Sequence, residues 1–125
     1  MPLGKLGNTI VYAPSSFWDA SKEDRDRVTN GCGPAGWKIG LISDNIWFLS
    51  IVDACNIHDW MYEYAEYTEE AKQTADKVFR DNIVRIVNAK TKWNWLRKLR
   101  YKSAQAYYIL VICFGGPFFW KGKKV

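Results

Sequence analysis

The only histidine of the chain, His58, lies among side chains that could carry out chemistry. Cys55 comes three residues before it, Asp59 follows it directly, and Tyr62 comes four residues after it. Helical spacing would place Cys55, His58 and Tyr62 in one band of a helix surface, with Asp59 at the edge of that band. Imidazole is the side chain whose unperturbed pKa lies closest to neutrality. If this protein uses an imidazole as a general base, His58 must be that base.

A second acidic residue, Asp76, is predicted to face His58 across a helical hairpin. Residues 45–65 and 68–88 both have the apolar spacing of helices, and the short connection between them favours antiparallel packing. His58 precedes Tyr67 by nine residues and Asp76 follows it by nine. Both therefore lie about 13 Å from the turn, at roughly 1.5 Å of rise per residue. Because a carboxylate on the apolar stripe of a helix needs a partner, we expect His58 to pair with Asp76.

An imidazole held by a carboxylate at one nitrogen can use its other nitrogen for proton transfer. Tyr62, one turn after His58, could donate its hydroxyl to the same carboxylate. No serine or cysteine nucleophile is evident beside this pair, because a disulfide at Cys55 would leave no free thiol. The pair therefore suits the activation of water. Attack of water on an ester needs an electrophile for the developing oxyanion. Asp59, together with carbonyl oxygens of the glycine-rich segment 30–37, offers the hard oxygen ligands that calcium prefers.

The three cysteines differ in their surroundings. Cys113 lies in an apolar run, and we expect it to be a small buried hydrophobic residue. A bridge between Cys32 and Cys55 would form only in an oxidising compartment. It would close a loop of about 23 residues, worth roughly 3 kcal/mol in the chain-entropy model. Such a bridge would hold the glycine-rich segment beside Asp59.

The segment Ala54–Tyr62 resembles the active-site helix of phospholipase A2 enzymes, whose shared pattern is Cys-x-x-His-Asp-x-x-Tyr, in the Ala-Cys form of the bacterial and fungal members. Residues 31–36, Gly-Cys-Gly-Pro-Ala-Gly, are similar to the calcium loop of that family, and Asp76 is similar to its second aspartate. The resemblance covers residues 30–88, under half of the chain. The helical patterns and weak strand signals of the whole chain predict an all-α fold in a single domain, 1–125. The resemblance implies a phospholipase A2-like core of two antiparallel helices with a glycine-rich calcium loop and an additional C-terminal helix.

The resemblance also implies an activity, the calcium-dependent hydrolysis of the sn-2 ester of glycerophospholipids. His58 would be the general base, oriented by Asp76 and Tyr62. The backbone N–H of Gly33 would help calcium to stabilise the oxyanion. The calcium ligands that the resemblance implies are Asp59, Gly31, Gly33 and Ala35. Ala35 stands where the animal-type loop has glycine, and if this position needs a positive φ angle the loop must differ. The departure removes no catalytic group, so it concerns calcium affinity more than the chemistry.

Charge divides the chain into two halves. Residues 1–81 hold 8 Lys and Arg against 13 Asp and Glu, whereas residues 82–125 hold 10 Lys and Arg and no acidic residue. The segments 90–102 and 118–125 combine these cations with aromatic residues, a mixture that suits contact with anionic lipid. The predicted partner is therefore a phospholipid surface. Single-stranded nucleic acid is a less favoured partner for the same composition, and a solvated basic face needs no partner at all.

The remaining elements are expected to be short or helical. Outside the hairpin we expect an irregular arm at 1–16 with a short extended piece at 9–12, a short helix capped by Ser21 and ending before Asn30, a helix at 96–114, and an aromatic and basic tail at 115–125. Strand signals are weak. No apolar run reaches the roughly 18 residues of a membrane span, and no N-terminal signal segment is evident. Secretion or delivery to membranes is favoured if the Cys32–Cys55 disulfide forms.

Other interpretations of the same residues stay open. His58 could be a satisfied core histidine, and Asp76 could form an ordinary helix ion pair with Lys72, worth about 0.3–0.5 kcal/mol. Metal phosphohydrolases also use His-Asp pairs, but their sites need several histidines. A non-catalytic membrane- or protein-binding module on the same scaffold would bind calcium poorly and hydrolyse nothing.

Overall fold

A computed structural model of the chain describes residues 2–29 and 43–120. The described part is mostly helical, with six helices and two small antiparallel sheets. Its elements are β1 (Leu3–Leu6), β2 (Thr9–Tyr12), α1 (Ser15–Asp19), α2 (Lys22–Val28), β3 (Asn45–Ile46), β4 (Leu49–Ser50), α3 (Val52–Tyr64), α4 (Glu69–Lys90), α5 (Asn94–Phe114) and α6 (Gly116–Phe119). At this coarse level the expected helical fold is confirmed.

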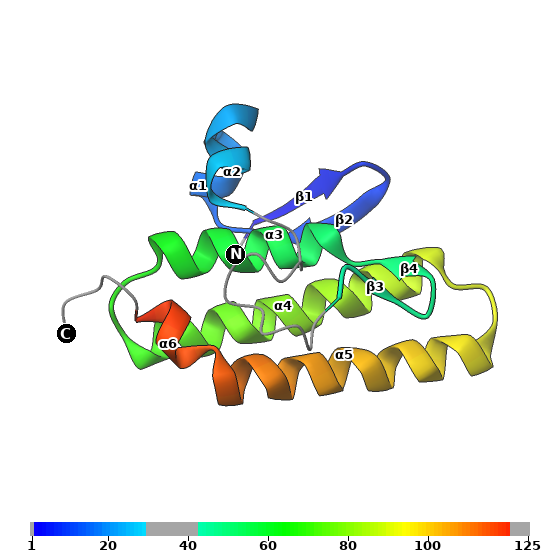
Figure 1. Cartoon of the computed structure of the whole chain (residues 1–125). Helices are drawn as coiled ribbons and strands as arrows, with labels where there is room; N and C mark the ends of the chain where they lie inside the picture. Colours follow the sequence, from blue (N-terminus) through cyan, green and yellow to red (C-terminus); the bar gives the residue numbers. More distant parts are fainter. Residues whose placement is uncertain (1, 30–42, 121–125) are drawn as a thin grey trace.

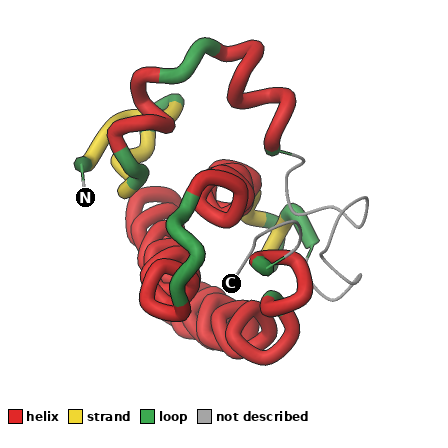
Figure 2. Tube along the Cα trace, turned by 90° about the vertical axis from the view of Figure 1, so that its left-hand side faces the viewer, coloured by secondary structure: helices red, strands yellow, loops and turns green. Residues whose placement is uncertain are grey.

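The three long helices, α3, α4 and α5, form one layer with α4 in the middle (Figure 1). The connections at 65–68 and 91–93 are short, so each helix runs antiparallel to the one before it. The β1–β2 hairpin packs on α4 through β2, and α2 packs on α3. In Figure 1 these N-terminal elements are drawn above α3. Figure 2 views the long helices nearly end-on and shows the N-terminal elements at one edge of the bundle. The expected antiparallel arrangement of the two central helices is present.

The first central helix begins at Val52, so the expectation that it begins at Asn45 is wrong. The segment 45–50 is a β-hairpin in which Ile46 pairs with Leu49. A three-residue spacing of apolar side chains fits one face of a helix, but it also fits the closing pair of a hairpin with a two-residue turn. Periodicity therefore could not separate the two structures over so short a segment.

Trp47 and Phe48 form the turn of this hairpin, and both have positive φ angles, 46° and 65°. This conformation costs a residue with a Cβ about 1–2 kcal/mol. The buried Arg100 holds the turn from α5: its Nη2 and Nε donate to the Trp47 carbonyl at 2.6 and 3.3 Å, and its Nη1 donates to Thr91 Oγ1 at 2.8 Å. Hydrogen bonds from a charged group, about 1.5–3 kcal/mol each, are strong enough to offset the strain.

The helix starts follow their capping residues. The Thr68 side chain accepts from the Ala71 N–H at 3.0 Å and begins α4, as expected. The Ser21 side chain accepts from the Asp24 N–H at 3.1 Å and begins α2. Each cap satisfies an N–H that has no partner within the helix, which is why these residue types mark the boundaries reliably.

The N-terminal arm is more ordered than expected. Instead of an irregular segment with one extended piece, it forms the β1–β2 hairpin, turned through Gly7 at φ 57°, followed by the short helix α1. The fully buried Asn82 of α4 attaches the hairpin: its Oδ1 accepts from the Tyr12 N–H at 2.7 Å and its Nδ2 donates to the Tyr12 carbonyl at 2.8 Å. Asn82 thus acts on Tyr12 as a neighbouring strand would.

Cys113 is exposed and free, so the expectation that it is buried is wrong. Ala104 and Val111 are the apolar α5 residues that are buried, whereas Ile109 and Ile112 are about half exposed. Cys113 belongs to the same outer side of α5. The sequence 104–114 is apolar all round, so its composition did not reveal which side faces α4.

No helix within residues 2–29 and 43–120 is long and apolar enough to cross a bilayer.

We expect Asn82→Ala to lower the free energy of unfolding by about 2–4 kcal/mol, because both backbone groups of Tyr12 would lose their partner. Chemical denaturation monitored by circular dichroism measures the change. Gln73→Ala, at an exposed position of the same helix, is the control and should change stability by less than about 0.5 kcal/mol. Equal stability of Asn82→Ala and the parent chain would contradict this role.

Candidate active site

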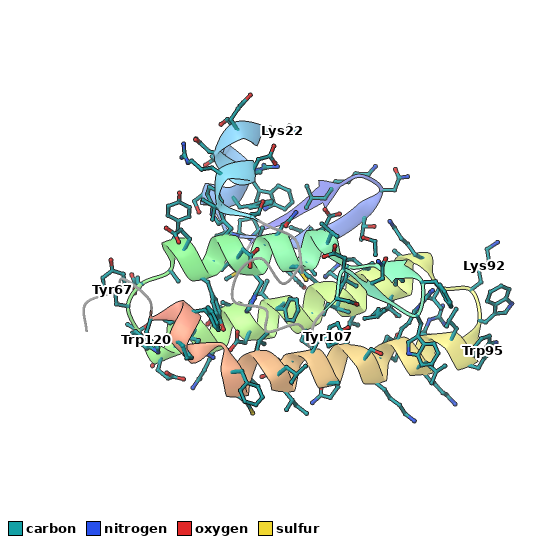
Figure 3. The ribbon with its side chains drawn as sticks, viewed as in Figure 1. Lys22, Tyr67, Lys92, Trp95, Tyr107 and Trp120 are labelled. Atoms are coloured by element: carbon teal, nitrogen blue, oxygen red, sulfur yellow. The ribbon has the colours of Figure 1, made fainter. Side chains whose placement is uncertain are left out.

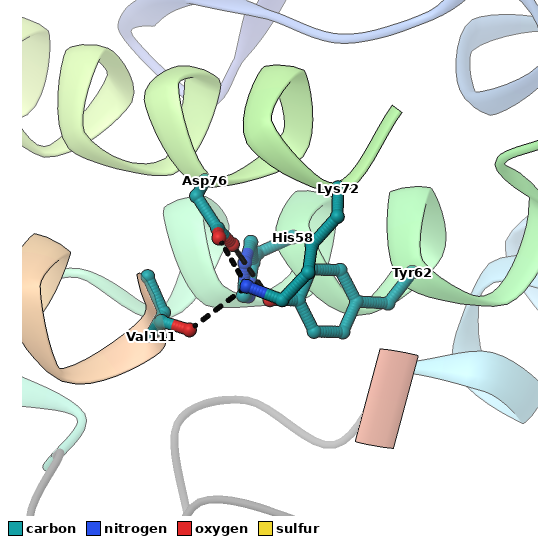
Figure 4. A network of polar contacts seen from close by, with 5 residues as sticks. All are labelled: His58, Tyr62, Lys72, Asp76 and Val111. Atoms are coloured by element: carbon teal, nitrogen blue, oxygen red, sulfur yellow. Dashed lines mark hydrogen bonds and ion pairs between the residues drawn. The ribbon is translucent and has the colours of Figure 1, made fainter. Parts of the chain in front are cut away.

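His58 of α3 and Asp76 of α4 meet across the seam between the two helices. His58 Nε2 lies 2.8 Å from Asp76 Oδ1, and the two residues are 0% and 1% exposed. Figure 4 shows the imidazole and the carboxylate facing each other. The contact expected from the antiparallel register is confirmed. The same contact also fits the alternative that His58 is a satisfied core histidine.

Asp76 accepts from two further side chains. Tyr62 donates its hydroxyl to Asp76 Oδ1 at 2.6 Å, as expected. Lys72 donates to the other oxygen, Oδ2, at 2.8 Å, and also to the carbonyl of Val111 at 3.2 Å (Figure 4). The pairing with Lys72, considered from the sequence as an alternative to the pairing with His58, is present together with it. The two carboxylate oxygens therefore serve three donors.

This network holds Asp76 ionised. Burial alone would raise the pKa of Asp76, but the hydrogen bond and charge interaction with His58, and the hydrogen bonds from Lys72 and Tyr62, outweigh burial and hold its pKa below the ordinary value of 3.8. An ionised carboxylate can only accept hydrogen bonds, so Nε2 of His58 must carry the hydrogen of their contact. In the neutral imidazole, Nδ1 is then the nitrogen with the lone pair. The network thus assigns the tautomer that a general base requires.

Tyr62 is fixed as a hydrogen-bond donor. Burial, and secondly the charge of the neighbouring carboxylate, raise the pKa of Tyr62 well above its ordinary value of 10.0, so the phenol keeps its proton. Its ring packs edge-on against Phe119 of α6 at 5.1 Å. A Cβ at Gly115, just before α6, would collide with the Tyr62 hydroxyl and with the Val111 carbonyl. Glycine at this position therefore lets the chain pass close behind the network.

Aromatic rings fix the plane of the imidazole. The His58 ring lies 4.2 Å from the Tyr62 ring and 4.7 Å from the Phe79 ring, centroid to centroid. Phe79 is an apolar residue of α4, and the pattern around His58 did not point to it. Its place one turn after Asp76 was the signal that could have linked it to the site.

Lys72 is the site residue whose importance sequence reasoning missed. It is 5% exposed and joins α4 to the last turns of α5 through the Val111 carbonyl. The i, i+4 spacing to Asp76 identified the ion pair but suggested a weak surface contact. Burial makes it a strong interaction, because removing one partner would leave a charge without compensation.

The residues expected to bind calcium are only partly within the described structure. Asp59 lies beside His58 on α3 and is 8% exposed. The other expected ligands, Gly31, Gly33 and Ala35, lie outside the described residues. Within the described ranges no three His, Cys, Asp or Glu side chains are grouped so that they could hold a metal ion. A calcium site at Asp59 would therefore need the backbone carbonyls that the resemblance implies.

Cys55 is buried and disulfide-bonded. Cys32, the partner expected from the sequence, lies outside the described residues. The disulfide removes the Cys55 thiol as a nucleophile. It also ties the first turns of α3, which carry His58 and Asp59, to another part of the chain.

Comparisons of this chain with protein-family models, with curated proteins and with solved structures find no match.

Asp76→Asn should destabilise the protein in a pH-dependent way. Because the folded-state pKa of Asp76 is lowered, its charge stabilises the fold fully above the ordinary pKa of 3.8, and this contribution is lost as the pH falls through the lowered folded-state pKa. Near pH 7 the variant should be less stable by about 3–5 kcal/mol, because Lys72 would be left as an unpaired buried charge. Denaturant unfolding from about pH 7 to about pH 2 should show this difference shrinking below about pH 4. A difference that stays constant over this range would contradict the assignment.

Proposed function

We propose that this protein is a calcium-dependent, phospholipase A2-like esterase that hydrolyses the sn-2 ester of glycerophospholipids. The observation that carries the proposal is the buried contact between His58 Nε2 and Asp76 Oδ1, which leaves Nδ1 as the basic nitrogen. Support comes from the segment around His58, which resembles the phospholipase A2 active-site helix, and from the antiparallel helix that supplies the second aspartate. We propose a phospholipase A2-like core within a single domain.

In the proposed reaction, His58 Nδ1 takes a proton from a water molecule as the water oxygen attacks the ester carbonyl carbon. The positive charge that forms on the imidazole is stabilised by the ionised Asp76 through Nε2–H. When the tetrahedral intermediate collapses, the bond from carbon to the glycerol oxygen breaks, and the proton on Nδ1 passes to that oxygen. The products are a fatty acid and a lysophospholipid.

Tyr62 and Lys72 are positioning residues in this scheme. Tyr62 donates to Oδ1 and Lys72 donates to Oδ2 of Asp76, so the carboxylate keeps its orientation as charge develops on His58. Preorganised hydrogen bonds of this kind require no rearrangement during the reaction. The Val111 contact extends the support to α5.

Asp59 would supply carboxylate oxygens to calcium, a hard cation that binds oxygen ligands. Asp59 directly follows His58 on α3, so it would hold the metal near the general base. The remaining ligands in the proposal are the backbone carbonyls of Gly31, Gly33 and Ala35, and the N–H of Gly33 would donate to the oxyanion. When bound, calcium would polarise the ester carbonyl and offset the negative charge on its oxygen.

The proposed substrate surface is a phospholipid membrane, contacted by segment 90–102 at the start of α5. Segment 118–125, the other segment expected to contact lipid, begins in α6, at the opposite end of that helix (Figure 1). Trp93 and Trp95 at the start of α5 are 61% and 62% exposed, and their rings stack at 6.5 Å. Exposed lysines accompany them at positions 90, 92, 98 and 102. Indole rings at headgroup depth with cations against anionic lipid are typical of an interfacial surface.

A second candidate function is a non-catalytic binding module on the same scaffold. The complete burial of His58, at 0% exposure, favours it, because the same network would then only stabilise the bundle. The two functions differ in one measurable property, the hydrolysis of lipid in the presence of calcium.

Replacing His58 by Gln should lower phospholipid hydrolysis about 100- to 10,000-fold, since the variant lacks the general base. The assay follows fatty acid release from vesicles with calcium and with a chelator, and chelation should reduce the activity of the parent chain similarly. Glu63→Gln, an exposed change on the same helix, is the control and should retain full activity. Hydrolysis that survives in a folded His58→Gln protein would exclude this mechanism. A parent chain that hydrolyses nothing with calcium would favour the binding module.

Lys72→Met should lower kcat about 10- to 100-fold with little change in KM, because Asp76 loses a charge-assisted hydrogen bond of roughly 1.5–3 kcal/mol. Lys77→Met removes the same charge from an exposed position of α4 and should leave both constants unchanged. Near-UV circular dichroism establishes that each variant is folded. Equal kcat values for the two variants would show that Lys72 has no positioning role.

A further inference from the structure

The turn of the β3–β4 hairpin carries two large aromatic side chains in a conformation that they disfavour. Trp47 and Phe48 have φ angles of 46° and 65°, and they are 49% and 98% exposed. Two-residue turns with two positive φ angles are usually formed by Asn-Gly or Asp-Gly, which adopt them at less cost. The turn therefore combines strain with nearly complete exposure of a phenylalanine.

Neither feature is explained by folding. The hairpin needs only the pairing of Ile46 with Leu49, whose side chains are buried. Arg100 holds the turn through the Trp47 carbonyl, a backbone contact that any residue at position 47 could make. Strained residues that the surrounding structure holds in place are concentrated at functional sites. The identity of the two side chains thus indicates a contact outside the chain.

The turn lies at the end of the bundle where α4 passes into α5. The hairpin is drawn beside this connection in Figure 1, and Lys92 and Trp95 mark the same end in Figure 3. Arg100 connects the two parts, since it donates both to Trp47 and to Thr91 of the connection. Four aromatic side chains, those of Trp47, Phe48, Trp93 and Trp95, are therefore exposed at one end of the molecule.

Charge distinguishes this end from the opposite one. The aromatic end carries the exposed Lys90, Lys92 and Lys98, and no acidic residue occurs after Asp81 in the chain. Asp44 and Asp53, which flank the hairpin in the sequence, are partly buried. The other end, at the connection of α3 to α4, carries Tyr67 (Figure 3). Its exposed acidic residues are Glu63, Glu66, Glu69 and Glu70. An anionic surface would attract the first end and repel the second.

We propose that the Trp47–Phe48 turn is a membrane anchor, which inserts its two aromatic side chains into the interfacial region of an anionic phospholipid bilayer. The lysines of the same end contact the lipid headgroups, and Arg100 keeps the inserted turn rigid against α5. In naming lipid as the partner, this inference rests on the proposed function, but binding can be tested without hydrolysis. A bilayer is favoured over a protein partner because exposed lysines lie at the same end as the aromatic residues, and together they match an anionic lipid surface.

The experiment measures co-sedimentation of the full chain with vesicles of phosphatidylcholine and phosphatidylserine, in a chelator so that lipid is not consumed. The parent chain and His58→Gln should bind equally, and both should bind vesicles of phosphatidylcholine alone more weakly. The double variant Trp47→Asn with Phe48→Gly keeps a turn of the same type and should fold with an unchanged or higher Tm. Its affinity for the anionic vesicles should fall about 10- to 100-fold, through loss of the buried aromatic area.

The matched control removes two aromatic side chains from the acidic end. Tyr64→Ser with Tyr67→Ser should bind anionic vesicles as the parent chain does. Equal binding of the Trp47→Asn, Phe48→Gly variant and the parent chain would overturn the anchor, as would a parent chain that does not bind vesicles. A parent chain that is dimeric by light scattering, and becomes monomeric only in this variant, would assign the turn to self-association instead. A parent chain that binds the vesicles but does not hydrolyse their lipid when calcium is present would contradict the proposed function and would still support the anchor.

Discussion

A buried negative charge at Asp76 constrains the whole helical bundle. The carboxylate is almost completely removed from water, and such a charge is tolerated only when its oxygens accept hydrogen bonds from compensating donors. The donors come from α3, through His58 and Tyr62, and from α4 itself, through Lys72. Lys72 also binds a carbonyl of α5. Satisfying one carboxylate therefore fixes how three long helices lie against each other.

The same constraint prepares the chemistry that we propose. Because Asp76 is ionised, it accepts the Nε2 hydrogen of His58 and leaves Nδ1 as the basic nitrogen. The rings of Tyr62 and Phe79 fix the plane of the imidazole. No separate device is needed to orient the base, since the interactions that stabilise the bundle also select the tautomer. The network that stabilises the bundle would thus also prepare His58 for the proposed chemistry.

The sequence predicted the centre of the site well and its surroundings less well. The meeting of His58 and Asp76 was predictable because a short connection and a fixed rise per residue determine which positions face each other on antiparallel helices. The hairpin at 45–50 was not predicted, because its apolar spacing also fits a helix. Its turn could not be found from residue type, since Trp47 and Phe48 are unusual in a turn with positive φ. The prediction that Cys113 is buried was wrong, because a helix that is apolar on all sides does not reveal which of its faces is buried.

By itself, the sequence determined what local rules control: the helical periodicity, the caps at Ser21 and Thr68, and the register that brings His58 to Asp76. Only the tertiary structure decided which groups lost contact with water. Burial made the pairing of Lys72 with Asp76, which the sequence suggested as a weak helix contact, part of the central network. The buried Arg100 likewise holds the strained turn at Trp47 and Phe48. The physical reason is that spacing along the chain determines the direction of a side chain from its helix and its position along the helix axis. The strength of a polar contact depends instead on the exclusion of solvent, which is produced by segments far apart in the sequence.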